Sequence, residues 1–143
     1  GETDSEWSFC HLMYLLQNLW LPPGAPPSLD RRYRAVTEFA RKLQPLGPAN
    51  FVYSDGEYLF VHGHRRTQPG REGFHPPGLH WLCRTCSPGA RHAPIPGLSF
   101  DPAARIPHQK AVLVASVPLT DEAWKPLGEG EILVFRRGEQ VLP

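Results

Sequence analysis

The residues near the start of the chain have the types and the spacing of a small binding site. Thr3-Asp4-Ser5-Glu6 precedes a run rich in apolar residues. A threonine followed three residues later by a glutamate is the sequence of a capping box, which begins a helix. A carboxylate in the first helical turn lies beside the positive end of the helix dipole, where backbone N–H groups hold it in place. Asp4 is therefore predicted to be able to bind an ammonium group through a charge-assisted hydrogen bond.

A second group of residues has the ligand types of a zinc site. Cys83 and Cys86 form a Cys-x-x-Cys motif, and His75, His80 and His92 are close in sequence. A zinc knuckle needs a second ligand pair at suitable spacing, and the sequence contains no second Cys-x-x-Cys. We therefore favour packing or surface roles for both cysteines, with a zinc or redox site as the alternative.

Three further polar residues are of types that take part in catalysis. His62 and His64 alternate onto one face of a predicted strand, and no neighbouring residue in the sequence orients them for acid/base chemistry. A solvated face or an interface edge is the better interpretation. Ser116 lacks the Gly-x-Ser-x-Gly elbow and a base visible in the sequence, so it is not predicted to be a nucleophile.

Two helices are predicted ahead of the strands. Apolar residues recur at helical spacing over residues 5–20, directly after the capping box, and again over residues 29–43, which follow Ser28. Pro45, Gly47 and Pro48 then end the second helix.

From Asn50 onward the pattern indicates strands. Residues 51–53 and 58–62 flank Ser54-Asp55-Gly56-Glu57, and an Asp-Gly pair between two β-rich runs predicts a hairpin. Further strands are expected over residues 79–83, 110–117, 131–135 and 140–142. Proline-rich and glycine-rich segments at residues 21–27, 69–77 and 88–107 are expected to be loops. Two helices followed by about six mostly antiparallel strands indicate an α+β fold.

Composition limits the classes of function. The 143 residues are 41% hydrophobic with a formal net charge of +1, which suits one domain over residues 1–143. The arginine pairs are scattered rather than gathered in one stripe, so a nucleic-acid partner is not expected. No apolar run is long enough to cross a bilayer, and three cysteines do not make a disulfide framework. We expect a cytoplasmic protein of bacterial type, with no membrane partner.

Five motifs, taken in order, resemble the C-terminal half of a class II glutamine amidotransferase. The branch that is most similar is the small stand-alone one that includes the ergothioneine-pathway amidohydrolases. The motifs are Gly1-x-Thr3-Asp4-Ser5-Glu6, Asn50-Phe51-x-x-Ser54-Asp55-Gly56-x-Tyr58, Leu79-His80-Trp81, Val114-Ala115-Ser116-x-Pro118-Leu119-Thr120, and Trp124-x-x-Leu127-x-x-Gly130-Glu131.

The resemblance implies half of an αββα N-terminal-nucleophile hydrolase sandwich, with two stacked antiparallel sheets between helices. It implies that a Cys at the mature N-terminus attacks the side-chain amide of glutamine, forms a γ-glutamyl thioester and releases ammonia, without a cofactor. In this family an Asn-Gly pair supplies the oxyanion hole, an Arg binds the α-carboxylate of the substrate and an Asp binds its α-ammonium group. Asp4 falls on the position of that Asp, and Thr3, Ser5 and Ser116 are expected to support the pocket.

The sequence also departs from the family pattern. It has no Cys near position 1, no Asn-Gly pair and no preceding strand that carries the Arg. Cys10 lies inside the first predicted helix and is expected to pack in or near the core. Three explanations are open: a missing N-terminal half carries the Cys, a partner chain carries it, or the chain is a relative of the family that no longer catalyses. In each case we predict that this chain alone does not hydrolyse glutamine.

Three interpretations follow. The first is a glutamine amidotransferase segment that contributes Asp4 to the glutamine pocket; the second is a hydrolase of a γ-glutamyl small molecule on the same fold. The third is a non-catalytic binding or assembly module, stapled by zinc through Cys83 and Cys86. A half-fold would leave the apolar faces around Phe51, Phe60 and residues 112–114 uncovered.

Overall fold

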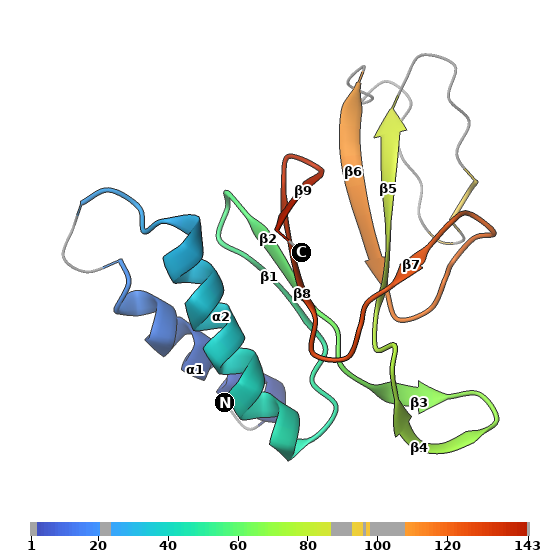
Figure 1. The fold of residues 1–143 in the computed structure, drawn as a ribbon, viewed down its shortest axis with the longest axis horizontal. Helices are drawn as coiled ribbons and strands as arrows, with labels where there is room; N and C mark the ends of the chain where they lie inside the picture. The colour runs from blue at the N-terminus through green and yellow to red at the C-terminus, as the bar shows by residue number, and fades with distance from the viewer. Residues whose placement is uncertain (1–2, 21–23, 87–92, 96, 98–107, 143) are drawn as a thin grey trace. The chain divides into compact units, whose positions relative to one another are not determined.

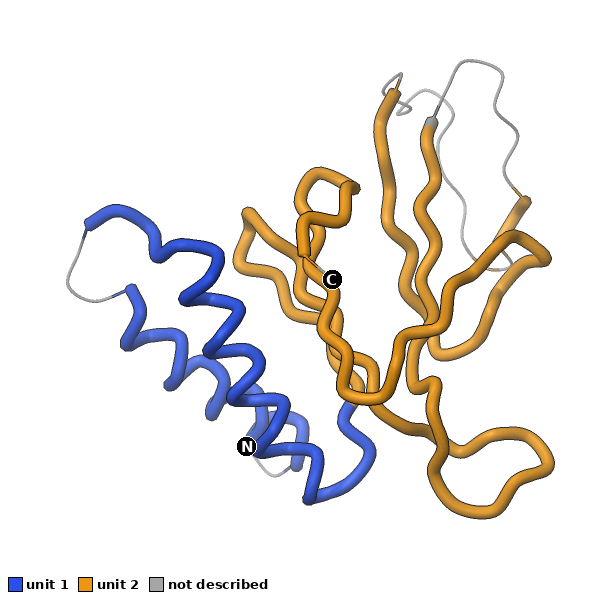
Figure 2. The backbone as a smooth tube through the Cα atoms, viewed as in Figure 1, with its two compact units in different colours: residues 1–49 blue, residues 50–143 orange. Residues whose placement is uncertain are grey.

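The structure is a computed structural model that describes residues 3–20, 24–86, 93–95, 97 and 108–142. The chain divides into two compact units, residues 1–49 and residues 50–143 (Figure 2). The prediction of one domain over residues 1–143 stays a prediction.

The first unit is helical. Helix α1 spans Asp4–Gln17, helix α2 spans Leu29–Leu43, and a short 3-10 helix, η1, spans Gln44–Leu46. The predicted bounds of α2 are confirmed. Helix α1 ends earlier than predicted, because Leu19 and Trp20 donate backbone hydrogen bonds to the third residue before them and continue the helix only as tight turns.

The two helices contact one another along their apolar faces (Figure 1). The residues that are buried are Leu12 and Leu16 of α1 and Val36, Phe39 and Ala40 of α2. Arg32 is also buried: its Nε donates to the Pro27 carbonyl at 2.7 Å, and its guanidinium lies 5.1 Å from the centre of the Trp20 ring. A buried guanidinium is tolerated because a carbonyl and an aromatic face replace its hydration.

The second unit consists of antiparallel strands in three sheets (Figure 1). Sheet A has the order β1-β2-β8-β9, formed by Phe51–Ser54, Leu59–His62, Ile132–Arg136 and Glu139–Leu142. Sheet B pairs β3 (Arg66–Gln68) with β4 (Arg71–His75). Sheet C has the order β6-β5-β7, formed by Gln109–Ala115, His80–Cys86 and Lys125–Pro126.

The hairpin between β1 and β2 confirms the prediction from Asp-Gly. One carboxylate oxygen of Asp55 accepts from the backbone N–H groups of Glu57 at 3.0 Å and Tyr58 at 2.8 Å. Gly56 has a φ of 90°, which glycine adopts at little cost. Asp55 and Gly56, the pair on which the prediction was based, therefore stabilise the turn.

A hydrophobic core joins sheets A and C. Val61, Leu133 and Phe135 come from sheet A, Trp81 comes from β5, and the Trp81 and Phe135 rings lie 5.2 Å apart. Leu79 and Leu127 complete the buried cluster. The two antiparallel sheets are thus stacked on a shared core, as the family resemblance implies.

Three strands were missed by the sequence analysis, so the described part of the chain has nine strands rather than about six. The segment 69–77, expected to be a loop, contains β4, which pairs with β3 across a turn at Gly70 (φ 71°). Gly73 (φ 78°) lies within β4. This hairpin is largely exposed and lacks apolar alternation, so the pattern that predicts strands is absent from it. Most of the third predicted loop, residues 88–107, lies outside the described residues.

The prediction of uncovered apolar faces is wrong at Phe60, which is fully buried in β2. Phe51 and the β6 residues Val112, Leu113 and Val114 are half-buried. As for membranes, neither helix of the described part of the chain combines the length and the apolar character that crossing a bilayer requires.

Candidate functional site

Asp4 lies at the first helical position of α1, where the predicted capping box is present. The Thr3 Oγ1 accepts from the Glu6 backbone N–H at 3.2 Å, and the Glu6 Oε2 accepts from the Thr3 backbone N–H at 3.3 Å. These reciprocal bonds satisfy N–H groups that a helix start would otherwise leave without partners. The predicted capping box is confirmed, and its hydrogen bonds fix the backbone that carries Asp4.

The Asp4 carboxylate is held by its neighbour and is open to solvent. Its Oδ1 accepts from the Ser5 backbone N–H at 2.8 Å and lies 3.4 Å from the Ser5 Oγ. An exposed carboxylate with a fixed rotamer at a helix N-terminus loses little side-chain entropy when it binds a cation. Ser5 contacts the Asp4 carboxylate and Thr3 caps the helix that carries it. Supporting roles of Thr3 and Ser5 in a substrate pocket, and the recognition of a substrate ammonium by Asp4, stay predictions.

His62 and His64 were expected on a solvated face or an interface edge, and the solvated face is wrong. Their side chains are 0% and 3% exposed, and their rings stack with 6.2 Å between centroids. β2 lies inside sheet A between β1 and β8, so His62 is flanked by strands on both sides. The Phe51 ring on β1 lies 4.9 Å from the His62 ring. β2 ends at His62, so His64 lies two residues beyond the strand that was predicted to carry both histidines. The sequence could not reveal that β2 is a central strand.

Charged groups surround His64. The Arg65 Nε donates to the His64 Nε2 at 3.1 Å and lies 3.2 Å from a carboxylate oxygen of Glu129. The same Glu129 oxygen lies 3.7 Å from the His64 Nε2. This cluster was not predicted, because Glu129 is far from His64 in sequence.

Asn50 links three segments of the second unit. Its Oδ1 accepts from the His64 backbone N–H at 2.7 Å, and its Nδ2 donates to the Arg65 carbonyl at 2.8 Å. An added Cβ on Gly78 would lie 1.8 Å from the Asn50 Oδ1, so Gly78 leaves the space that the amide occupies. Asn50 belongs to one of the five family motifs, but no role was predicted for it.

A second polar network, also missed, binds sheet C to the segment that follows β6. Arg84, on β5, is 9% exposed and pairs with both carboxylate oxygens of Glu122. Thr120 Oγ1 donates to the same carboxylate at 2.7 Å and accepts from the Trp124 Nε1 at 3.0 Å. Arg84 also donates to the Ala93 carbonyl at 2.9 Å. A buried guanidinium is stable here because each contact is to an acceptor.

The Cys-x-x-Cys motif lies in an extended strand. Cys83 and Cys86 both belong to β5, whereas a zinc knuckle places its two cysteines on a tight turn. The Cys83 Sγ lies 3.7 Å from the Gly138 carbonyl oxygen, and burial raises the pKa of the Cys83 thiol, opposed by the charges of Lys125 and Lys110. Cys86 has its side chain outside the described residues. Within the described part of the chain, His, Cys, Asp and Glu side chains form no group of three that would hold a metal ion.

Cys10 is exposed on α1, so the expectation that it packs in or near the core is wrong. Ser116, which was expected to support the pocket, directly follows the end of β6 and is exposed. Its carbonyl oxygen accepts from an Arg66 guanidinium nitrogen at 2.9 Å. A supporting role for its side chain stays a prediction.

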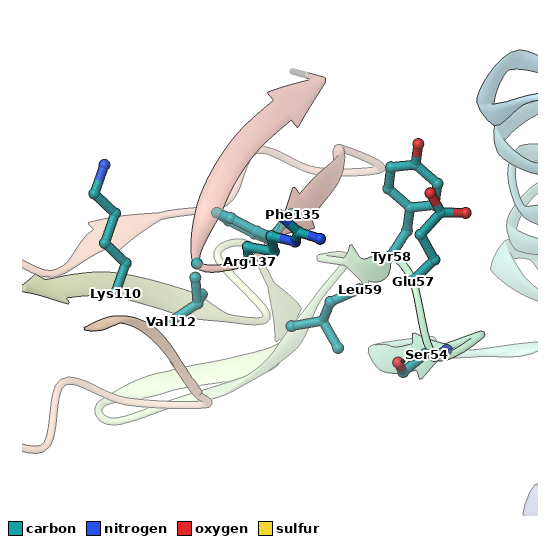
Figure 3. A pocket seen from close by; sticks show the side chains of 10 residues that line it. Ser54, Glu57, Tyr58, Leu59, Lys110, Val112, Phe135 and Arg137 are labelled. Carbon is teal, nitrogen blue, oxygen red and sulfur yellow. Dashed lines mark hydrogen bonds between the residues drawn. The ribbon is translucent and has the colours of Figure 1, made fainter. Parts of the chain in front are cut away.

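A pocket of about 190 Å³ opens between sheets A and C (Figure 3). Its apolar residues are Leu59, Val112 and Phe135, and the charged residues Glu57, Lys110 and Arg137 lie around them. Glu57 is paired with Arg136 at 2.9 Å, and Lys110 is paired with Glu139. The remaining lining residues are Ser54, Gly56, Tyr58 and Gly138.

Known proteins match this chain along nearly its whole length. The model of a family described as "Glutamine amidotransferases class-II" matches residues 1–143. An Escherichia coli K12 protein named "Putative glutamine amidotransferase YafJ" is 27% identical over 144 residues, covering 99% of this chain and 51% of that protein. An uncharacterized protein of Methanocaldococcus jannaschii is 31% identical over 148 residues, covering 99% of this chain and 36% of that protein.

A solved structure shares the fold. The crystal structure of a predicted glutamine amidotransferase from Pseudomonas aeruginosa superposes with a TM-score of 0.70 at 24% sequence identity. The match covers 100% of this chain and 51% of that one. The chain therefore spans about half the length, or less, of the relatives that it matches.

Proposed function

Because this chain belongs to the class II glutamine amidotransferase family, we propose that it supplies the carboxylate of Asp4 to the glutamine pocket of an amide-hydrolysing site. The observation that carries the proposal is the fixed position of Asp4 at the start of α1. The capping box sets the backbone, the Ser5 N–H sets the carboxylate, and the carboxylate remains exposed. A carboxylate held in this way suits the α-ammonium group of a free amino acid.

The reaction proposed is that of the family. A thiolate, from a Cys outside this sequence, attacks the side-chain carbonyl carbon of glutamine and forms a C–S bond. The C–N bond breaks, the nitrogen takes up a proton and ammonia leaves; water then hydrolyses the thioester to glutamate and restores the thiol. Asp4 takes no part in these bond changes. It binds and orients the substrate, which lowers the entropy cost of reaching the reactive geometry.

The chain by itself is proposed to be inactive. It contains neither a Cys near Asp4 in sequence, other than the helical Cys10, nor an Asn-Gly pair for the oxyanion. The rest of the site is assigned to polypeptide beyond this sequence or to a partner chain.

The experiment is a steady-state assay of ammonia release from glutamine by the full-length protein. Asp4→Asn is expected to raise KM for glutamine by roughly 10-fold or more, with a smaller change in kcat, since a charge-assisted contact to the substrate is lost. Asp30→Asn is the matched control, because Asp30 also lies in the first turn of a helix but pairs with Arg34 at 3.1 Å.

Equal KM values for the two variants would refute the role of Asp4. No ammonia release from the unaltered full-length protein would refute the glutaminase activity itself. Release of ammonia by the 143-residue chain alone would refute the proposal that the nucleophile lies elsewhere.

A further inference from the structure

The pocket between sheets A and C combines an apolar wall with charged side chains. Its volume of about 190 Å³ has room for a small molecule. Its apolar side chains are Leu59, Val112 and Phe135, and its charged side chains are Glu57, Lys110 and Arg137. A concave site with an apolar wall and a few charged groups is typical of a binding site for a small organic molecule.

Two of the charged side chains have partners of opposite charge. Glu57 pairs with Arg136 at 2.9 Å. Lys110 pairs with Glu139, and the hydrogen bond from Lys110 lowers the pKa of the Glu139 carboxyl, so that Glu139 stays ionised. Among the described residues that line the pocket, no carboxylate is therefore left to bind an ammonium group of a ligand.

Arg137 is the third charged side chain. Within the part of the chain that the structure describes, its guanidinium makes no ion pair. Figure 3 shows this side chain extending from the β8–β9 turn toward the side of the pocket where Tyr58 and Glu57 lie. The pocket therefore has one positive charge that is not compensated, next to its apolar wall.

The turn that carries Arg137 has an unusual residue at this position. Arg137 and Gly138 connect the paired residues Arg136 and Glu139, and φ is 51° at Arg137 and 78° at Gly138. The first position of such a turn is normally Asn, Asp or Gly, because other residues reach a positive φ at a cost. An added Cβ on Gly138 would clash with the Lys110 carbonyl oxygen, so the turn packs directly against β6. An arginine at this costly position points to a role for its side chain.

We propose that this pocket binds a small organic carboxylate. The carboxylate group of the ligand is bound by Arg137, and its apolar body lies against Leu59, Val112 and Phe135. A guanidinium binds a carboxylate through two parallel N–H···O bonds, which adds geometric specificity to the attraction of charge. The apolar wall favours a ligand with a hydrocarbon part over inorganic phosphate, because the hydrocarbon part is removed from water.

The inference goes beyond the proposed function and does not depend on it. The lining residues all lie within residues 54–138, in the second unit, whereas Asp4 belongs to the first. The chemistry of the two ligands also differs. Glutamine carries an ammonium group, which would lie near the Arg137 charge without a carboxylate partner in this pocket. A carboxylate ligand and glutamine are therefore not expected to compete.

Benzoate is the probe, because it joins a carboxylate to a flat apolar ring of small size. Its binding to the full-length protein is followed by the amide chemical shifts in proton–nitrogen correlation spectra. Saturable shifts are expected at residues 54–59 and 135–138, with a dissociation constant of roughly millimolar order, since the ligand has few atoms. Benzamide has a similar shape without the charge and is expected to bind roughly 10-fold more weakly.

Arg137→Asn is the test variant, because it removes the charge and places a residue that favours the positive φ of this turn. Its affinity for benzoate is expected to fall roughly 10-fold or more. Its melting temperature is expected to stay equal or to rise, so the loss of affinity does not come from unfolding. Arg71→Asn is the matched control, since Arg71 is an exposed arginine of β4 outside the pocket lining. This control is expected to bind benzoate with unaltered affinity.

Four results would overturn the inference. The first is the absence of saturable shifts at residues 54–59 and 135–138. The second is equal affinity of Arg137→Asn and the unaltered protein for benzoate. The third and fourth are binding of benzamide, or of inorganic phosphate, as tight as that of benzoate.

Glutamine is then added as a competitor. Displacement of benzoate by glutamine would assign the pocket to glutamine recognition and would also overturn the inference. Ammonia release from glutamine is measured on the same sample. Benzoate binding without ammonia release would support the pocket and refute the proposed function, and ammonia release without benzoate binding would do the reverse.

Discussion

The side-chain amide of Asn50 is bonded to two consecutive backbone groups that lie fourteen and fifteen residues away. Its Oδ1 accepts from the His64 N–H at 2.7 Å and its Nδ2 donates to the Arg65 carbonyl at 2.8 Å. Asn50 precedes β1, and His64 and Arg65 follow β2, so the amide fastens the open end of the hairpin whose turn is at Gly56. One side chain thereby does what a further pair of ladder hydrogen bonds would do.

Asn50→Ala is expected to destabilise the protein by about 1–3 kcal/mol, because it leaves a partly buried N–H and a carbonyl without their partner. Urea unfolding followed by circular dichroism measures the change. Asn18→Ala is the control, since the Asn18 amide makes one exposed bond, to the Tyr14 carbonyl at 3.2 Å. If the two variants lose the same free energy of unfolding, the Asn50 link does not hold the hairpin.

Gly63→Ala is expected to cost about 1–3 kcal/mol through overpacking. A Cβ at Gly63 would lie 2.6 Å from the Cβ of Leu127, which is itself buried in the core cluster. Gly128→Ala is the matched control, because the nearest atom to its added Cβ is a Glu131 carboxylate oxygen at 3.5 Å. Thermal unfolding of both variants gives the comparison, and a Gly63→Ala midpoint equal to that of Gly128→Ala would contradict the close packing.

Arg84 and Glu122 are expected to be coupled by about 1–3 kcal/mol in a double-mutant cycle of Arg84→Met and Glu122→Gln. The coupling arises because Arg84 is 9% exposed and Glu122 accepts two of its hydrogen bonds. The exposed pair Arg34 and Asp30 on α2 provides the control cycle, with an expected coupling of about 0.2–0.5 kcal/mol. Urea unfolding of the unaltered protein, the single variants and the double variant gives the free energies from which each coupling energy is calculated. Equal coupling in the two cycles would show that burial adds nothing to the Arg84 pair.

The Cys83 thiol is expected to react with iodoacetamide only at higher pH than an ordinary cysteine. Burial raises the pKa of Cys83, so the reactive thiolate forms above the usual value of about 8.5. The rate is measured against pH in the Cys10→Ser/Cys86→Ser background. Lys125→Met is expected to move the midpoint further upward, because the Lys125 charge favours the thiolate. A midpoint at or below the ordinary value, or a downward shift in Lys125→Met, would contradict this assignment.

Local signals explain which elements were predicted correctly. The capping box at Thr3 and Glu6, the second helix and the Asp-Gly hairpin each depend on neighbouring residues, so their sequences were sufficient. The β3–β4 hairpin was not predicted, because its strands are exposed and their sequences carry no apolar alternation. Cys10 was misjudged because its helix has more apolar residues than one buried face requires, and the sequence does not say which face is buried.

The sequence by itself determined the family, the position of Asp4 at a helix start and the antiparallel character of the strands, because motifs, caps and alternation are local properties of the chain. The tertiary structure alone decided that His62 and His64 are buried, that Arg84 finds Glu122, and that β6 is an edge beside an open pocket. Each of these depends on which strands become neighbours. Strand order is set by the burial of the shared core between sheets A and C, which involves residues from Leu59 to Phe135 and cannot be read from any one segment.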